Sequence, residues 1–419
     1  MKNYLNPKVL IGNHKLLLTM DSSSAWNHID IFAGCGGISL GLHNAGWNGI
    51  FAIEKSRMAF ATLKYNLIDQ LNHFDWPAWL PTTEHDIVEV LINHQKELKE
   101  LRGKVTLVAG GPPCQGFSLA GKRNENDERN QLVKSYVKFV DLVRPNLLFF
   151  ENVRGFTSPF GEADNKRKPY SEVVIRNLEK LGYSVKDFII DFSDFGVPQK
   201  RKRFILIGCQ NGNIETFREK LYGLKRKFLR DKGLPERINL KDAISDLKRS
   251  HGEIVDSSNG RFLEGIYGPI ETPFQQLMRR GINTPNPDSH RFANHREKTI
   301  NRFKYIHKNC PKGQDIGQEV KDEFNIKKQV IIPLIADEPC NTLTTLPDDY
   351  IHYSEPRILT VRECARIQTF NDKFKFRENY TTGGAKRRQQ VPRYTQVGNA
   401  VPPLFMEIAG IALKAVTNG

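Results

Sequence analysis

The feature that most constrains this chain is a short apolar run that ends in a rigid, cysteine-bearing turn. Residues 104–109 (KVTLVA) form an apolar, β-branched run of the kind that fills a parallel sheet, and the next four residues are GGPP. Two consecutive prolines fix two φ angles and remove two backbone donors, so the loop after the strand is stiff. The turn therefore presents Cys114 in one direction, which suits a nucleophile. An isolated buried cysteine is the alternative, so the interpretation depends on the rest of the chain.

Short apolar runs alternate with helix-like stretches from about residue 28 to 208, which predicts a doubly wound, mostly parallel α/β sheet. The expected strands cover 28–32, 49–54, 105–109, 147–151, 184–190 and 203–207. Charged, Gly- and Pro-containing stretches between about 209 and 350 predict a smaller, less regular domain, and an apolar helix is expected at 401–415. We therefore expect a catalytic domain of residues 1–210, completed by 393–419, and a smaller domain of residues 211–392.

Composition limits the class of partner. Of the 419 residues, 62 are Lys or Arg and 47 are Asp or Glu, and the net charge of +15 favours a polyanion, nucleic acid first, over an acidic small molecule, with a solvated surface as the alternative. The six cysteines form no C-x-x-C pair, so we expect neither a metal site nor a disulfide framework. No apolar run reaches the roughly 20 residues that span a bilayer, and no signal-like segment is visible. A cytoplasmic protein without membrane contact is expected.

A glycine turn near the N-terminus predicts a cofactor crevice. Residues 29–37 (IDIFAGCGG) read as a strand that enters this turn, and residues 38–45 read as a helix that Gly46 can cap. Glu54 ends the next expected strand, where a carboxylate can accept hydrogen bonds from ribose hydroxyls, and Asp86 is placed to receive an adenine amino group. The turn alone could be structural, but this order of features predicts an adenosyl ligand. It does not separate a dinucleotide from S-adenosylmethionine.

Three groups join Cys114 at the carboxyl edge of the expected sheet. Glu151 ends the strand beside it, and the run QKRKR (199–203) sends Arg201 and Arg203 to one side of an extended segment. Seen singly, the acid and the basic run are more often solvated surface groups. Together they suit attack on a pyrimidine. An acid can protonate the ring nitrogen of cytosine, Arg201 can hold its 2-carbonyl oxygen, and cationic neighbours favour the Cys114 thiolate.

With these motifs, the chain resembles the DNA (cytosine-5)-methyltransferases of the type found in bacterial restriction–modification systems. The blocks DIFAGCGG (from Asp30), GGPPCQGFS (from Gly110), ENV (from Glu151), QKRKR, RILTVRECARIQTF (from Arg357) and QVGNAVPP (from Gln396) occur in the family's order over nearly the whole chain. The resemblance implies a Rossmann-like, class I S-adenosylmethionine-dependent methyltransferase fold. It also implies methylation of a cytosine that is flipped out of duplex DNA.

The resemblance assigns roles residue by residue. Cys114 is the expected nucleophile and Glu151 the acid, with Arg201 and Arg203 assisting them. The expected S-adenosylmethionine site comprises Phe32, Gly34, Gly36, Gly37, Glu54, Asp86, Pro113 and Asn399. Gly398 is expected to form a tight turn that lets the C-terminus return to the sheet, and residues 357–370 are interpreted as packing rather than chemistry. We expect a monomer, with a cognate restriction endonuclease as a separate partner.

Contacts to DNA are expected from two regions. The polar segment 119–129 follows the cysteine turn and is expected to close over DNA as a mobile loop, so Ser118, Lys122, Arg123 and Arg129 are predicted phosphate contacts. Target recognition is expected between about residues 213 and 329, where arginines can pair with guanine edges, although phosphate contact is the commoner role. The candidates there are Arg279, Arg280, Arg291, Arg296 and Arg302.

Three other functions compete with this interpretation. An RNA cytosine-5 methyltransferase of the same fold is the nearest, and the large segment between QKRKR and Arg357 favours duplex DNA instead. A nicotinamide-dependent oxidoreductase would share the cofactor crevice but gives no role to Cys114, Glu151 and Arg201 together. A non-catalytic DNA-binding regulator would not need those residues. The recognition sequence itself is not readable.

Overall fold

The computed structural model describes residues 26–113, 128–158, 169–212, 214–256, 260–382 and 390–417. It contains a six-stranded sheet in the order β2-β1-β3-β4-β6-β5, in which β6 runs antiparallel to both neighbours and the other pairs are parallel. All six expected strands are present, with ends shifted by at most two residues. They are β1 (Asn27–Ile31), β2 (Asn48–Ile53), β3 (Leu107–Gly110), β4 (Leu147–Val153), β5 (Ser184–Asp191) and β6 (Lys202–Cys209).

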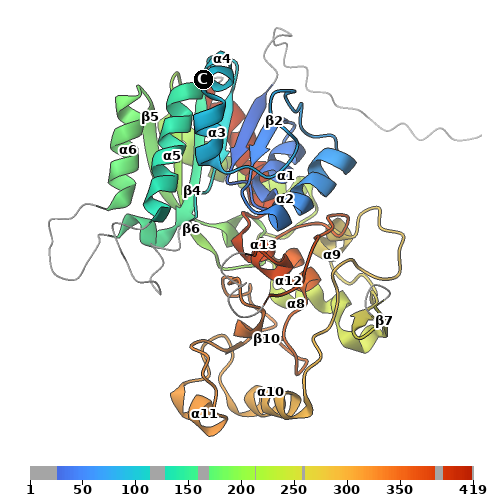
Figure 1. Ribbon diagram of the computed structural model, residues 1–419. Coiled ribbons are helices and arrows are strands. Elements are labelled where there is room, and N and C mark those ends of the chain that lie inside the picture. The colour runs from blue at the N-terminus through green and yellow to red at the C-terminus, as the bar shows by residue number, and fades with distance from the viewer. Residues whose placement is uncertain are drawn as a thin grey trace, which may run out of the picture.

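Helices cover both faces of the sheet (Figure 1). One face carries α3 (Ile87–Asn93), α4 (Gln95–Glu100), α5 (Glu128–Val143) and α6 (Tyr170–Lys180), and the other carries α1 (Gly37–Asn44), α7 (Phe217–Asp231) and α14 (Pro403–Thr417). Side chains alternate between these layers because successive residues of a strand face opposite ways. In β4, Leu147 and Phe149 join one apolar cluster, while Leu148 and Phe150 join the other. The fully buried strands explain the uninterrupted apolar runs in the sequence.

The C-terminal helix returns to the sheet, as expected. An ideal Cβ on Gly41 of α1 would lie 2.5 Å from the Met406 Cβ, so α1 and α14 pack with almost no gap. The expectation for Gly398 was wrong, because this residue lies in helix α13 (Arg393–Asn399) rather than in a tight turn. Its glycine is required for close approach, since a Cβ there would lie 2.3 Å from the Thr344 carbonyl oxygen.

Below the sheet lies a smaller lobe of short elements, as the irregular sequence predicted (Figure 1). Its helices are α8 (Leu240–Ile244), α9 (Pro273–Met278), α10 (Glu297–Asn309), α11 (Gln318–Glu323) and α12 (Val361–Ile367), with β7 (Glu253–Val255) paired to β8 (Leu263–Gly265) and β9 (Ile332–Pro333) paired to β10 (Tyr350–Ile351). Since α7 packs against α14, residues 217–231 lie with the sheet rather than with this lobe. The exact domain limits remain a prediction.

The packing role expected for residues 357–370 is confirmed. Arg366 is fully buried, with Nη1 2.8 Å from an Asp246 oxygen and Nη2 2.7 Å from an Asp372 oxygen. Arg357 pairs with the buried Glu363, 2.7 Å apart, and Glu363 also closes a capping box with Thr360 at the start of α12. These charges are satisfied inside the lobe.

In the described part of the chain, one helical stretch is apolar enough to cross a membrane by length and composition, Arg393–Thr417. Its most apolar window is 78% buried within the protein. This burial is the pattern of a core helix.

Candidate active site

The cysteine turn and the acid-bearing strand meet at the carboxyl edge of the sheet. β3 and β4 are parallel neighbours, so the chain leaves both at the same edge. The Asn152 Nδ2 donates to the Pro112 carbonyl oxygen at 3.3 Å, which ties the turn to β4. An ideal Cβ on Gly111 would lie 3.1 Å from the Glu151 Oε2. The carboxylate therefore lies against the turn that leads to Cys114, although Cys114 itself is outside the described residues.

Arg203 holds the other side of the same carboxylate. Its Nε lies 3.0 Å from the Glu151 Oε1, and the two side chains are only 12% and 13% exposed. The contact follows from the topology, because antiparallel β6 pairs Arg203 with Val153 at the end of β4. One carboxylate oxygen thus faces a guanidinium and the other faces the turn, as expected for an acid whose orientation matters.

Arg201 is buried and has different partners. Its Nη2 donates to the Gly398 carbonyl oxygen at 3.0 Å, and its Nη1 donates to the Leu343 carbonyl oxygen at 3.3 Å. Arg201 lies just before β6 and therefore connects the start of this strand to α13 and to the lower lobe. Its expected contact with a substrate carbonyl stays a prediction.

A pair of buried glutamines, which the sequence analysis missed, extends this connection. The Gln199 Nε2 donates to the Gln368 Oε1 at 2.9 Å, and both side chains are fully buried. The Gln368 Nε2 donates in turn to the carbonyl oxygens of Val397 and Ala400, at 2.8 and 3.1 Å. These bonds flank the exposed Asn399, so the glutamine pair fixes the backbone that carries this candidate cofactor residue. Nothing in the sequence distinguishes these glutamines from surface ones.

The backbone of the glycine turn after β1 has positive φ angles, as expected where a ligand approaches the chain closely. Phe32 and Gly34 have φ of 62° and 58°, and a Cβ on Gly34 would meet no atom within 4 Å, so space is open above the turn. The Glu54 Oε2 accepts from the Gly34 N–H at 2.9 Å and its Oε1 accepts from the Ser56 N–H at 2.7 Å. Burial raises the pKa of Glu54, while these backbone donors oppose the rise.

Two other glycines of this motif face protein rather than open space. A Cβ on Gly36 would lie 2.5 Å from a Leu67 side-chain carbon, and one on Gly37 would lie 2.4 Å from the Val401 carbonyl oxygen. Gly37 therefore allows the C-terminal segment to pack on the turn. Close packing therefore explains why these two positions are glycines, and their role in cofactor binding stays a prediction.

Asp86 lies close to the Glu54 end of β2, because the His85 N–H donates to the Glu54 carbonyl oxygen at 2.9 Å. Its carboxylate caps α3 by accepting from the Val88 N–H at 2.8 Å and pairs with Lys55 at 2.7 Å. Burial would raise the pKa of Asp86, but the hydrogen bonds from Lys55 and Val88 outweigh burial and lower it. Pro113 is exposed at the end of the described turn.

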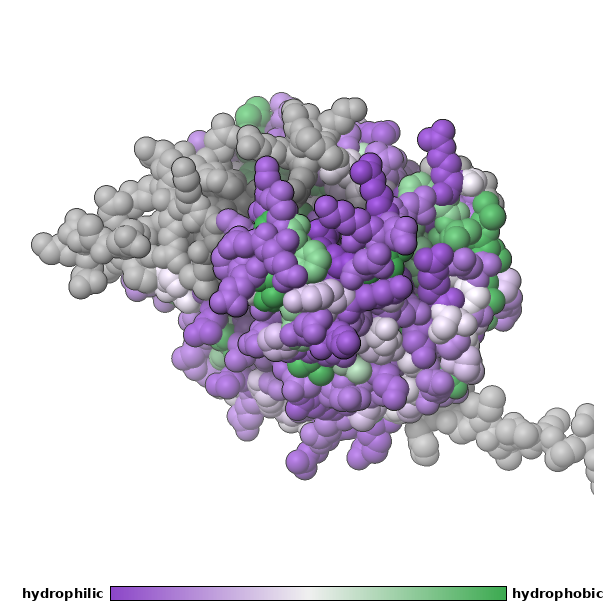
Figure 2. Space-filling view, turned by 90° about the horizontal axis from the view of Figure 1, so that it is seen from below, coloured by the Kyte–Doolittle hydropathy of each residue, from purple (hydrophilic) through white to green (hydrophobic). Residues whose placement is uncertain are grey.

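Some of the arginines predicted to contact DNA already have partners within the protein, whereas others are exposed. Arg279 lies over the Tyr267 ring at 4.1 Å and donates to the Gly268 carbonyl oxygen at 2.7 Å, and Arg291 is stacked 3.5 Å from the Tyr380 ring centroid. These internal contacts compete with DNA binding. Arg280 and Arg296 are exposed, and Arg302 is half-buried. The coloured part of the face seen from below is mostly hydrophilic (Figure 2). Ser118, Lys122, Arg123 and the Arg129 side chain lie outside the described residues, as does most of the expected loop.

Comparison with known proteins adds a family match. A family model described as C-5 cytosine-specific DNA methylase matches residues 26–415. The chain is 29% identical over 398 residues to the type II methyltransferase M.DdeI of Desulfomicrobium norvegicum, covering 91% of this chain and 86% of that protein. It is 32% identical over 397 residues to the type II methyltransferase M1.HphI of Haemophilus parahaemolyticus, covering 93% and 87%.

Solved structures share the fold. A protein described as a prophage-encoded DNA modification methyltransferase (E. coli) superposes with a TM-score of 0.63 at 22% identity, over 94% of this chain and 99% of that one. The Entamoeba histolytica methyltransferase EhMeth gives a TM-score of 0.51 at 14% identity, over 93% and 98%.

Proposed function

Because the chain belongs to the C-5 cytosine-specific DNA methylase family, we propose that the sheet edge between β3, β4 and β6 is where it binds and activates its target cytosine. The protein transfers a methyl group from S-adenosylmethionine to the 5-position of cytosine in DNA. One observation carries the assignment of the site: the Glu151 carboxylate lies between Arg203 and the turn that leads to Cys114. This contact supports a role for Glu151 as an acid that acts with the expected nucleophile.

The residues of this edge suit a covalent route. C6 of cytosine resists a nucleophile until its ring nitrogen N3 is protonated or strongly hydrogen-bonded, and Glu151 is the group that supplies this proton. The Cys114 thiolate forms a bond to C6, and the electron pair of the ring moves so that C5 becomes nucleophilic. S-adenosylmethionine, when bound, supplies an electrophilic methyl group to C5. Loss of the C5 proton to a base then re-forms the C5–C6 double bond and expels the thiolate, N3 returns its proton to Glu151, and the demethylated donor leaves as S-adenosylhomocysteine.

The crevice above the glycine turn fits the methyl donor. Open space over Gly34 accommodates a ligand against the backbone, and each Glu54 oxygen keeps a lone pair for a ribose hydroxyl after accepting its backbone donor. Asp86, at the same end of β2, is assigned to the adenine. Phe32, Pro113 and Asn399 complete the proposed site, and Gly36 and Gly37 shape it.

Duplex DNA is read by the smaller domain in this proposal. Among the candidate arginines, Arg280 and Arg296 are the better candidates for DNA, because Arg279 and Arg291 already have internal partners. We also assign a phosphate-binding role to Ser118, Lys122, Arg123 and Arg129. We also propose that the protein acts as a cytoplasmic monomer whose cognate restriction endonuclease is a separate protein.

A mechanism-based trap tests the proposed active site. The methylated sequence is first mapped by bisulfite sequencing of DNA from cells that express the chain. A duplex with 5-fluorocytosine at that position should then give a complex that survives denaturation, because fluorine cannot leave as a proton after methyl transfer. Normal turnover of this duplex would exclude the covalent route.

A domain exchange tests where DNA is read. Replacing residues 232–329 with the equivalent segment of a relative, which leaves α7 packed on the sheet, should transfer the methylated sequence without changing the chemistry. An active chimera that still modifies the original site would place recognition in the large domain.

A further inference from the structure

Helices α2 (Arg57–Leu63) and α9 lie near the junction of the two lobes (Figure 1). A separate cleft is lined by residues of both lobes. Its volume is about 690 Å³, within the range of small-molecule sites, and its walls come from both lobes. One wall is lined by Leu40, Tyr65, Asn66, Gln70 and Leu71, and the other by Tyr267, residues 281–284, Asn286, Asp288 and residues 371–375. None of the proposed catalytic or methyl-donor residues lines it.

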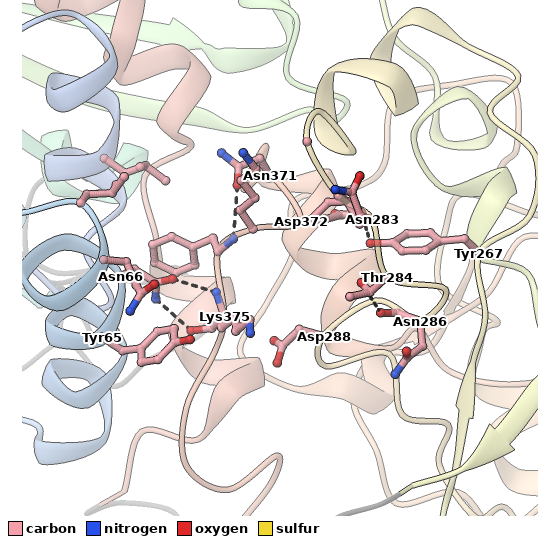
Figure 3. A pocket seen from close by; sticks show the side chains of 17 residues that line it. Tyr65, Asn66, Tyr267, Asn283, Thr284, Asn286, Asp288, Asn371, Asp372 and Lys375 are labelled. Atoms are coloured by element: carbon pink, nitrogen blue, oxygen red, sulfur yellow. Dashed lines mark hydrogen bonds between the residues drawn. The ribbon is translucent and has the colours of Figure 1, made fainter.

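The upper wall has an uncommon backbone. Helix α2 (Arg57–Leu63) continues directly into a π-helix, Lys64–Gln70, a conformation that occurs preferentially at functional sites. Asn66 of this π-helix clamps the lower lobe, since its Oδ1 accepts from the Lys375 N–H at 2.8 Å and its Nδ2 donates to the Lys375 carbonyl oxygen at 2.9 Å. Figure 3 shows this clamp at the edge of the cleft. The backbone that carries the lysine is therefore fixed.

Alternation along residues 372–377 places cations in the cleft. Phe374 and Phe376 are buried, whereas Lys373, Lys375 and Arg377 are exposed. Lys373 extends along its own wall toward residue 281, because an ideal Cβ on Gly281 would lie 2.6 Å from its Nζ. Lys373 and Lys375 of this segment thus line the space between the lobes.

The charge of the cleft is not neutralised by its own carboxylates. Asp372 is bound by Arg366 at 2.7 Å, and Asp288 is paired with Arg362 at 3.3 Å. Among the residues that the structure describes, Lys373 and Lys375 have no carboxylate within ion-pair distance. The remaining charge is positive, so the cleft favours an anion.

The rest of the lining suits a planar, hydrogen-bonding group. The Tyr65 ring is half-buried in the upper wall, and the amide side chains of Gln70 and Asn283 are exposed on opposite walls. A phosphate alone would fill little of this volume. We propose that the cleft binds a nucleoside phosphate, with its phosphates at Lys373 and Lys375 and its heterocycle beside Tyr65, Gln70 and Asn283.

A ligand in this position would contact both lobes at once. It would therefore favour one relative placement of the sheet and the DNA-reading lobe, and binding there would change DNA affinity by the same factor by which DNA changes nucleotide affinity. This ligand is separate from the methyl donor, and its binding does not require methyl transfer.

Calorimetry on the full-length chain tests the site. Saturating S-adenosylhomocysteine blocks the methyl-donor crevice, and guanosine diphosphate is then titrated. The Lys373→Gln/Lys375→Gln variant should bind it at least about tenfold more weakly than the wild type, because two charge-assisted contacts are lost. Lys96→Gln/Lys99→Gln, which removes the same charge from the exposed face of α4, should bind as the wild type does. No binding to the wild type, or equal weakening by both pairs, would overturn the proposal.

Two further arms separate the parts of the ligand and its source. Asn283→Ala should weaken guanosine diphosphate and leave pyrophosphate unchanged, and equal affinities of the wild type for the two probes would remove the heterocycle from the proposal. If DNA supplies the phosphates instead, the double lysine variant would lose about two units from the salt dependence of DNA binding while guanosine diphosphate fails to bind. That result would assign the lysines to DNA and refute the nucleotide site.

Discussion

Arginines at the sheet edge and arginines in the core of the lower lobe are used in opposite ways. Arg203 lies against one oxygen of Glu151 and leaves the other oxygen facing the cysteine turn. Arg366 is enclosed by Asp246 and Asp372, and these two carboxylates balance its charge within the core. An arginine that pairs with one oxygen of an acid leaves the other oxygen available for chemistry. An arginine enclosed by two buried acids stabilises the fold instead. Partners, rather than residue type, separate the two roles.

The largest loss of activity is expected at the sheet edge. Cys114→Ser should abolish methyl transfer while cofactor and DNA binding remain, because an alcohol is a far weaker nucleophile than a thiolate at neutral pH. Methyl transfer and S-adenosylhomocysteine affinity are measured together. Cys340→Ser is the matched control, since Cys340 is buried and burial raises its pKa strongly. More than a few per cent of wild-type turnover in Cys114→Ser would remove it from its role.

The largest loss of stability is expected in the lower lobe. Arg366→Met leaves two buried carboxylates without their cation and should lower the free energy of unfolding by about 3–5 kcal/mol, measured by denaturant titration. The control Arg226→Met removes an arginine whose side chain is 88% exposed and should change little. A loss below about 1 kcal/mol at Arg366 would mean that this core tolerates unpaired acids and that the comparison fails.

The two buried acids should respond to neutralisation in different ways. Glu151→Gln should lower the rate by about 10²-fold with little effect on stability or cofactor affinity, because it removes the proton donor to the ring. Glu363→Gln, which weakens the bonds to Arg357 and the α12 cap, should lower stability and leave the rate per folded molecule unchanged. Weaker cofactor binding with intact single-turnover chemistry in Glu151→Gln would reassign this residue to the methyl-donor site.

The glutamine pair connects the two regions, so its loss should be smaller and specific. Gln368→Met removes the side-chain donor to the Val397 and Ala400 carbonyl oxygens and should weaken S-adenosylhomocysteine binding by about tenfold. Gln275→Met removes an equally buried glutamine of the lower lobe and should cost stability alone. Equal affinity in the two variants would show that Gln368 does not position Asn399.

An effect of similar size, confined to a change of pH, is expected from a buried histidine chain that begins at His28 in β1. The His73 Nε2 lies 2.9 Å from the His28 Nε2, and burial, followed by the charge of His43, lowers the pKa of His73 to about 3. The unfolded chain protonates near 6.5, so this contribution is present above pH 6.5 and is lost as the pH falls toward 3. Between pH 7.5 and 5.5, His73→Asn should lose about 1.4 kcal/mol less stability than the wild type. His85→Gln is the control, and parallel pH profiles for the wild type and His73→Asn would contradict the prediction.

The sequence by itself determined the sheet and most of the edge. Apolar runs such as 147–150 are long and uninterrupted because both faces of the strand are buried, so local pattern was sufficient to place them. Glu151 and Arg203 follow from the same strands, because a residue at the end of a strand has its position set by the strand. The acid-and-glycine order around Gly34 and Glu54 was readable for the same reason.

Only the folded structure shows which polar groups already have a partner within the protein. Gly398 was misread as a turn because its real constraint is a carbonyl from Thr344, distant in sequence. Arg201 and Gln368 have partners in segments far along the chain, and Arg279 is held by Gly268 and Tyr267 rather than left free. The cleft between Tyr65 and Lys373 likewise exists only where two lobes meet. Local sequence encodes backbone preference, but the partner of a polar group depends on contacts that only the folded chain creates.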